Sequence, residues 1–135
     1  MNTNRLSQLT FVLLRVVTGL MFLCHGAQKL LGAFGGAGDG GGTVPLASLM
    51  GVGGVLELVG GSLILLGLFT RPVAFVLAGE MAVAYFQMHF PHAFWPIENH
   101  GELAVLYCFV FLFLATHGGG SYSVDAELGK RRHSS

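Results

Sequence analysis

Charged side chains are scarce in this sequence, and cysteines are nearly absent. Asp, Glu, Lys and Arg make up 10% of the 135 residues, whereas ordinary soluble domains carry roughly 25%. Seven basic and seven acidic residues cancel, so we expect no basic surface for nucleic acid. Cys24 and Cys108 form no CxxC pair and are too few for a disulfide scaffold. We expect both to pack as small apolar side chains.

Apolar residues are abundant, at 53% of the chain, and they gather in four long runs. The runs cover about residues 7–31, 46–69, 72–89 and 101–117. Each is long enough, or nearly so, to cross a hydrocarbon core of roughly 30 Å as a helix. The sequence therefore predicts an all-α fold: a single membrane domain over residues 1–135, built as an integral membrane antiparallel four-helix bundle, with residues 118–135 as a tail.

The basic residues indicate how such a bundle would be oriented. Arg5, Arg71 and the run Lys130 to Arg132 would all lie on one side of the membrane. The opposite loops hold no Lys or Arg apart from Lys29 at the end of the first run. The positive-inside rule then places both termini in the cytoplasm. Arg15 interrupts the first run and no cleavage site follows it, so we expect this helix to be retained and not removed as a signal peptide.

Small and ionisable residues recur together at helical spacing in the first two runs. Small residues let helix backbones approach closely in lipid, so these stripes should face the protein interior. The first stripe is Arg15, Gly19, Phe22, Gly26 and Lys29, and the second is Gly53, Glu57, Gly60, Ile64 and Gly67.

Glu57 and Glu80 are expected near the membrane midplane, with Arg15 about 6 Å toward its cytoplasmic side. Charges at this depth are costly and need a partner or a function. Two carboxylates beside one guanidinium are unfavourable, so one glutamate is expected to hold a proton. The three residues would then form a proton-handling catalytic site. A structural ion network that fixes the packing of the helices explains the same residues equally well.

A second polar group is expected nearer the outer surface, formed by His25, Lys29, His89 and Glu102. We interpret it as a ligand-binding pocket or a proton route, with Glu102 orienting Lys29. Asn99 and Glu102 also have the spacing of a capping box at the start of the fourth helix. The pair His89 and His92 is interrupted by Pro91, which disfavours helix before it. We therefore expect neither a metal site nor a haem.

Several motifs taken together resemble the DoxX family of small four-helix bacterial membrane proteins. They are Arg15 with His25-Gly26-Ala27-Gln28-Lys29, Glu57-x-x-Gly60-Gly61 with Gly67 to Arg71, Glu80-Met81 to Ala84, Phe94-Trp95-Pro96, Asn99-His100-Gly101-Glu102 and Gly118 to Asp125. Two positions depart from the family pattern, because His100 and Gly119 stand where family members often have glycine and proline. The resemblance covers nearly the whole chain.

The resemblance implies a redox context in the bacterial inner membrane. The family is related to the membrane subunit of a thiosulfate:quinone oxidoreductase, and other members are associated with thiol and redox-stress systems. Our leading hypothesis is a membrane subunit of a quinone-linked oxidoreductase, in contact with the lipid bilayer and with a protein partner or larger complex. A non-catalytic accessory subunit and a proton-coupled carrier of small solutes, the latter requiring several copies of the chain, are the alternatives.

Overall fold

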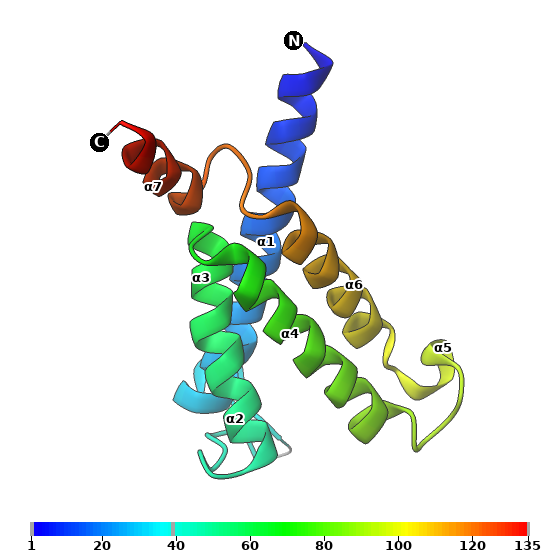
Figure 1. Ribbon diagram of the computed structural model, residues 1–135. Helices are drawn as coiled ribbons and strands as arrows, with labels where there is room; N and C mark the ends of the chain where they lie inside the picture. Colours follow the sequence, from blue (N-terminus) through cyan, green and yellow to red (C-terminus); the bar gives the residue numbers. More distant parts are fainter. Residues whose placement is uncertain (1, 39, 135) are drawn as a thin grey trace.

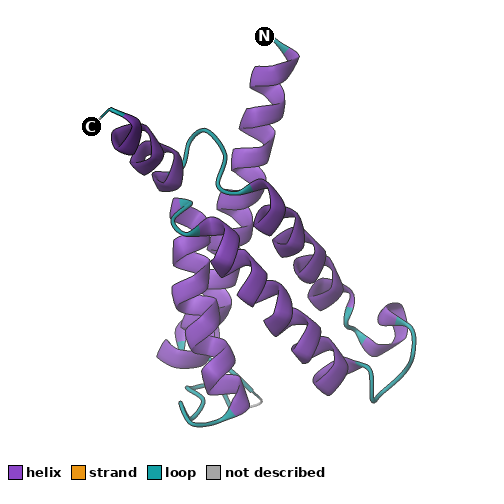
Figure 2. Ribbon diagram, in the orientation of Figure 1, coloured by secondary structure: helices purple, strands orange, loops and turns teal. Residues whose placement is uncertain are grey.

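The computed structural model describes residues 2–38 and 40–134, and all regular elements in this part of the chain are helical (Figures 1 and 2). Helix α1 is followed by a short 3-10 turn, and α2, η2 and α3 continue into one another. Helix α4 likewise continues into η3. The bounds are α1 Thr3–Leu31, η1 Ala33–Gly35, α2 Leu49–Val55, η2 Leu56–Gly60, α3 Gly61–Leu66, α4 Thr70–Ala84, η3 Tyr85–His89, α5 Pro96–Asn99, α6 Glu102–His117 and α7 Val124–His133.

The all-α prediction is confirmed, and the four expected runs coincide with helical stretches whose ends differ by a few residues. The second stretch ends at Leu66, earlier than expected, because Gly67 takes the left-handed conformation with a φ of 69°. Residues 118–135, predicted as a tail, include helix α7.

Two helical stretches in the described residues are long and apolar enough to cross a membrane, Thr3–Leu31 and Leu49–Leu66. Helix α6 is apolar but shorter. Helix α4 does not pass this test, although η3 lengthens it toward the span of a bilayer.

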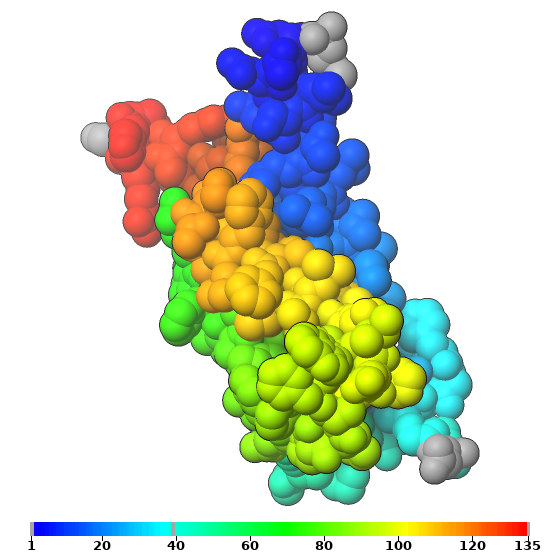
Figure 3. All heavy atoms as spheres, turned by 90° about the vertical axis from the view of Figure 1, so that its right-hand side faces the viewer, coloured from blue at the N-terminus to red at the C-terminus, as the bar shows by residue number. Residues whose placement is uncertain are grey.

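The helices associate in two pairs. Helix α1 packs along η2 and α3, and α4 packs along α6. Both termini lie at the same end of the molecule as the turn between α3 and α4, whereas α5 and the loop before α2 lie at the opposite end (Figure 1). Figure 3 shows the segment around α5 covering one side of that end. The buried side chains where the pairs meet include Phe22, Ile64, Leu77 and Phe111.

Glycines bring α1 against the second helical stretch. A Cβ atom on Gly19 would lie 2.5 Å from the backbone nitrogen of Leu65, and one on Gly26 would collide with the backbone nitrogen of Leu58. The predicted stripe on α1 therefore does face a neighbouring helix. Its partners are Gly54 and Gly61.

The predicted stripe on the second stretch faces a different neighbour. A Cβ on Gly53 would lie 3.1 Å from the Glu80 carboxylate, and one on Gly60 would lie 2.8 Å from the Leu77 side chain. Both neighbours belong to α4. The second stretch thus presents glycines to two helices, α1 on one side and α4 on the other.

Substituting Gly26 by alanine is expected to destabilise the protein by about 1–3 kcal/mol, because the new methyl group meets backbone that cannot rotate away. Thermal unfolding in detergent, followed by circular dichroism, measures the effect. Gly79→Ala is the matched control, since nothing lies within 4 Å of the added carbon. Equal stability of the two variants would contradict the close packing of α1.

The first turn of α7 is docked on the turn between α3 and α4. The Asp125 carboxylate accepts hydrogen bonds from the backbone nitrogens of Phe69, at 2.8 Å, and Thr70, at 2.9 Å. The Asp125 nitrogen donates to the carbonyl of Gly67 at 2.9 Å. Asp125 therefore caps the start of α4 from a distant part of the sequence.

Burial raises the pKa of Asp125, but its contacts with Thr70 and Phe69 and the nearby Arg15 charge outweigh this effect and hold the pKa below its ordinary value. A lowered pKa in the folded state means that the stabilisation is complete above the unfolded pKa and is lost as pH falls through the folded one. We expect melting temperatures to fall below about pH 4 and Asp125→Asn to weaken this acid dependence, with a cost of about 1 kcal/mol at pH 7. If the melting temperature of Asp125→Asn falls at low pH as much as that of the wild type, this assignment is refuted.

Candidate functional site

A cleft of about 590 Å³ opens between α2 and α4 and is closed behind by α1 and α6. Its walls are mostly aliphatic and aromatic, and its ionisable residues come from four helical stretches. The polar members are His25, Lys29, Glu57, Glu80, His89, His100 and Tyr107. A largely apolar cleft with a few converging polar groups is the usual form of a small-molecule site.

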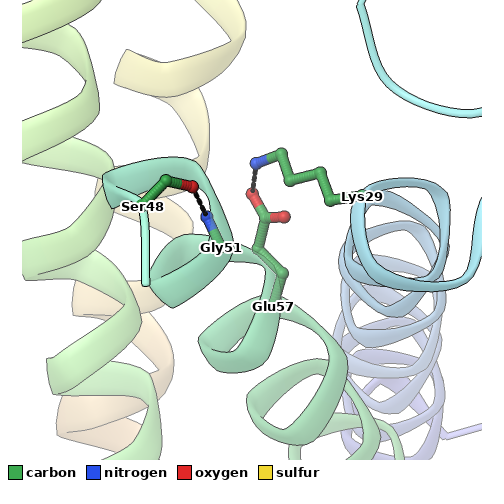
Figure 4. Close-up of polar contacts among 4 residues, drawn as sticks. All are labelled: Lys29, Ser48, Gly51 and Glu57. Carbon is green, nitrogen blue, oxygen red and sulfur yellow. Dashed lines mark hydrogen bonds and ion pairs between the residues drawn. The ribbon is translucent and has the colours of Figure 1, made fainter. Parts of the chain in front are cut away.

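An ion pair lies in this cleft. The Lys29 Nζ donates to Glu57 Oε1 at 2.7 Å, so that α1 and η2 are joined by their charged side chains (Figure 4). The Glu57 residue is 4% exposed, whereas the Lys29 side chain keeps 21% of its surface accessible. The pair neutralises the buried carboxylate and leaves other protons of the lysine ammonium free to meet a ligand.

Glu57 is positioned by a π-helical turn. Residues Leu56–Gly60 form η2, which interrupts the α-helical pattern between α2 and α3. Such turns add a residue to a helix and are frequent at functional sites. A second one, η3, carries His89 at the other side of the cleft. The two irregular turns of the long helices therefore flank the same cavity.

Unpartnered polar atoms also face the cleft. Glu57 Oε2, Glu80 Oε2 and the Tyr107 hydroxyl are buried and have no hydrogen-bond partner within residues 2–38 and 40–134. Buried polar groups are normally hydrogen-bonded, and exceptions call for an explanation. These three atoms offer two acceptors and a hydroxyl donor to a molecule bound among them.

The small size of Gly53 makes room for Glu80. An added Cβ there would lie 3.1 Å from Glu80 Oε1. Because Lys29 already contacts Glu57, the Glu80 carboxylate has no hydrogen-bonded cation of its own in the described residues. Glu80 is therefore the carboxylate that a proton or a ligand would satisfy.

Of the predicted inner layer, Glu57 and Glu80 come together in the cleft, whereas Arg15 is not part of it. The Arg15 guanidinium donates to the backbone carbonyls of Ile64 at 2.8 Å and Leu65 at 2.7 Å, at the end of α3. It also donates to the backbone carbonyl of Tyr122 at 2.8 Å. It is 2% exposed. Its contacts join α1, α3 and the C-terminal segment, which is a structural position.

Glu102 does not orient Lys29, and this prediction was wrong. Glu102 is exposed, and the partner of Lys29 is Glu57. The capping box was also wrong, because Gly101 is the N-cap of α6 and makes no side-chain cap. Asn99 is instead buried and binds Tyr85, Ala93 and Gly101, which holds the α5 loop together.

The histidines take different positions around the cleft. His25 meets the Tyr107 ring edge to face, with ring centroids 6.5 Å apart. His89 Nδ1 lies 3.1 Å from the carbonyl oxygen of Asn99. His100 lines the rim with a φ of 59°, in a conformation that favours glycine. A histidine in that strained conformation at a cavity rim is consistent with a role in the site.

Tyr107 is the cleft residue that the sequence interpretation missed. It lies in the buried stripe of α6 with Ala104, Phe111 and Leu114, at helical spacing. A hydroxyl within an otherwise apolar buried stripe was the available signal. In the described residues, no group of three or more His, Cys, Asp or Glu is placed to hold a metal.

Comparison with known proteins finds relatives that cover most of this chain. A Haemophilus influenzae protein named "Uncharacterized protein" is 43% identical over 121 residues, covering 87% of this chain and 90% of its own length. An uncharacterized membrane protein of Mycobacterium tuberculosis is 28% identical, covering 89% and 82%. "Putative oxidoreductase CatD" of Bacillus subtilis is 30% identical, covering 90% and 89%.

No solved structure gave a significant match. The DoxX family model matches residues 10–90, which include most of α1, the whole second helical stretch and α4. The matched region thus carries Lys29, Glu57 and Glu80, the charged residues of the cleft. On this match and the similarity of the relatives, the chain belongs to the DoxX family and is a membrane protein.

Proposed function

We propose that this protein is the membrane component of a quinone-linked oxidoreductase that works in sulfur, thiol or redox-stress chemistry. The observation that carries the proposal is the apolar cleft with the Lys29–Glu57 pair and the unpartnered Glu80 and Tyr107. A relative named as a putative oxidoreductase gives weak additional support. In this proposal the four helical stretches cross the bacterial inner membrane as an antiparallel bundle with both termini in the cytoplasm.

The cleft has the groups that a quinone head group requires. A quinone ring packs between apolar walls, and its two carbonyl oxygens accept hydrogen bonds. Lys29, beside the cleft opening, is the first donor, and the hydroxyl of Tyr107 is the second. His25 and His89 are further candidates on the walls. Glu57 would hold the Lys29 ammonium in place.

Reduction of a quinone to a quinol takes up two electrons and two protons. Glu80 is the group in the cleft best placed to exchange a proton, because its carboxylate faces the cavity without a hydrogen-bonded cation. With one lysine and two glutamates, a proton on Glu80 also brings the charge of the cleft to zero. The electrons would come from a protein partner or a soluble reductant, since the chain shows no redox-cofactor motif.

The proposal is tested by purifying the protein from its native membrane in mild detergent and measuring bound quinone and protein partners. We expect the wild-type protein to retain quinone. The variants Lys29→Met and Glu80→Gln should each retain less quinone by about tenfold or more. Glu102→Gln is the matched control, because this exposed carboxylate lies outside the cleft. Quinone turnover with the co-purified partner should also fall in the two cleft variants and not in the control.

Two results would contradict the proposal. Full turnover of a larger complex that contains Lys29→Ala and Glu57→Gln would indicate a non-catalytic accessory subunit. Proton-coupled uptake of a solute by the isolated protein in liposomes, with no quinone bound, would indicate a carrier.

A further inference from the structure

A second hollow lies beside the cleft, between the second helical stretch and α4. It has a volume of about 300 Å³. Among the described residues its walls are aliphatic side chains, a proline and a glycine, including Val55, Val59, Gly60, Leu63, Val73 and Leu77. No ionisable or hydrogen-bonding side chain lines this hollow, in contrast to the cleft. We name it the tail groove.

The tail groove and the cleft are neighbours. Leu56 and Val76 line both cavities, one from η2 and the other from α4. The second helical stretch and α4 diverge from the turn that joins α3 to α4 in Figure 1. The Leu56 and Val76 side chains are the shared wall between the cavities, so a molecule bound in the cleft has only their width to pass to reach the groove.

We propose that the tail groove binds the hydrocarbon tail of the ligand whose head group occupies the cleft. This inference rests on the proposed function, and it narrows the substrate class to quinones that carry a long isoprenoid or alkyl chain. Soluble quinones without a tail would fill only the cleft. In such a molecule the polar head group matches the cleft, and the apolar tail matches the groove beside it.

The groove is accessible to a chain that arrives from the bilayer. Val55 is 41% exposed and Val59 is 53% exposed, so the outer rim is open. Gly60 is buried at the inner side, where an added Cβ would lie 2.8 Å from the Leu77 side chain. The absence of a side chain at Gly60 therefore lets Leu77 pack directly against the helix backbone at the floor of the groove.

A tail in this groove gains little from leaving water, because it already resides in lipid. Its binding depends on close packing against the groove walls. A larger side chain on the rim should therefore exclude the tail and leave the head-group contacts of the cleft intact.

Binding of two probes to the protein in lipid nanodiscs tests the inference. One probe is a benzoquinone head group without a tail, and the other is the same head group with a decyl chain, with the ligand concentration expressed relative to lipid. We expect Val59→Phe to weaken binding of the decyl probe by about tenfold and to leave the tail-less probe unchanged. Val55→Phe, on the same rim, serves if Val59→Phe does not fold.

Val17→Phe is the matched control, since Val17 is 50% exposed on α1 and lines neither cavity. It should change neither affinity. Unchanged binding of the decyl probe to folded Val59→Phe or Val55→Phe would overturn the inference and place the tail among bulk lipid, while the proposed function would stand. If neither probe binds wild type, the proposed function fails, and the inference fails with it.

Discussion

The Arg15→Met variant is expected to be less stable than wild type by about 3 kcal/mol or more. The substitution removes the donors to the carbonyls of Leu65 and Tyr122, which lie in a partly buried region. Each buried acceptor left unpaired costs about 1–3 kcal/mol. The carbonyl of Ile64 is affected less, because it also accepts from the nitrogen of Gly67. Unfolding in mixed detergent measures the loss.

Two further variants separate the guanidinium geometry from the positive charge. Arg15→Lys keeps the charge but has a compact ammonium in place of the planar fork, so we expect an intermediate loss. Arg5→Met removes an exposed arginine near the start of α1 and should leave the stability almost unchanged. Wild-type stability of Arg15→Met would show that the three carbonyl contacts do not hold α1, α3 and the C-terminal segment together.

The second large effect is expected at the ion pair of the cleft. Lys29→Met leaves the buried Glu57 carboxylate without its cation, and breaking a buried pair from one side costs about 3–5 kcal/mol. Glu57→Gln leaves the more exposed lysine, so its cost should be smaller. The double variant Lys29→Met with Glu57→Gln should recover most of the stability lost in Lys29→Met.

A double-mutant cycle on these variants measures the coupling between the two side chains. The structure predicts strong coupling of Lys29 with Glu57 and none with Glu102, which lies exposed on α6. Coupling of Lys29 to Glu102 alone would contradict the observed pairing and restore the interpretation made from sequence spacing.

Helical spacing was sufficient to predict the face of α1. Gly19, Phe22 and Gly26 are buried, as a stripe of small and ionisable residues indicates, and Gly19 and Gly26 meet a neighbouring backbone. The inward position of Glu57 followed from the same reasoning. These features depend on local periodicity, which a sequence carries directly.

The side-chain partners could not be predicted in the same way. The π turn η2 changes the direction in which the residues after it point. The residue types in Leu56–Gly60 do not predict such a turn. An arginine side chain is long enough to place its guanidinium at a different depth in the bundle from its own Cα atom. The Arg15 guanidinium therefore reaches the end of α3 instead of the glutamates. Depth along a straight helix therefore grouped Arg15 with Glu57 and Glu80, whereas the structure brings only the two glutamates into one cleft.

The docking of Asp125 was hidden for another reason. Its partners Phe69 and Thr70 lie more than fifty positions earlier in the chain, and pairing at that separation depends on the fold. The motif around Ser123 to Asp125 contributed to the family resemblance, but the sequence did not show which residues it contacts. The structure shows that it caps α4 and fixes the beginning of α7.

Photolabelling with an azido-quinone tests the central claim, that the cleft binds a quinone head group, most directly. Labelled peptides from the protein in native membranes are identified by mass spectrometry, with and without excess unlabelled quinone. The account predicts labels on cleft-lining residues such as Tyr107 and Met81, lost on competition and reduced in Glu80→Gln. Labels confined to lipid-facing residues outside the cleft, such as Phe109, and unaffected by competitor, would contradict it.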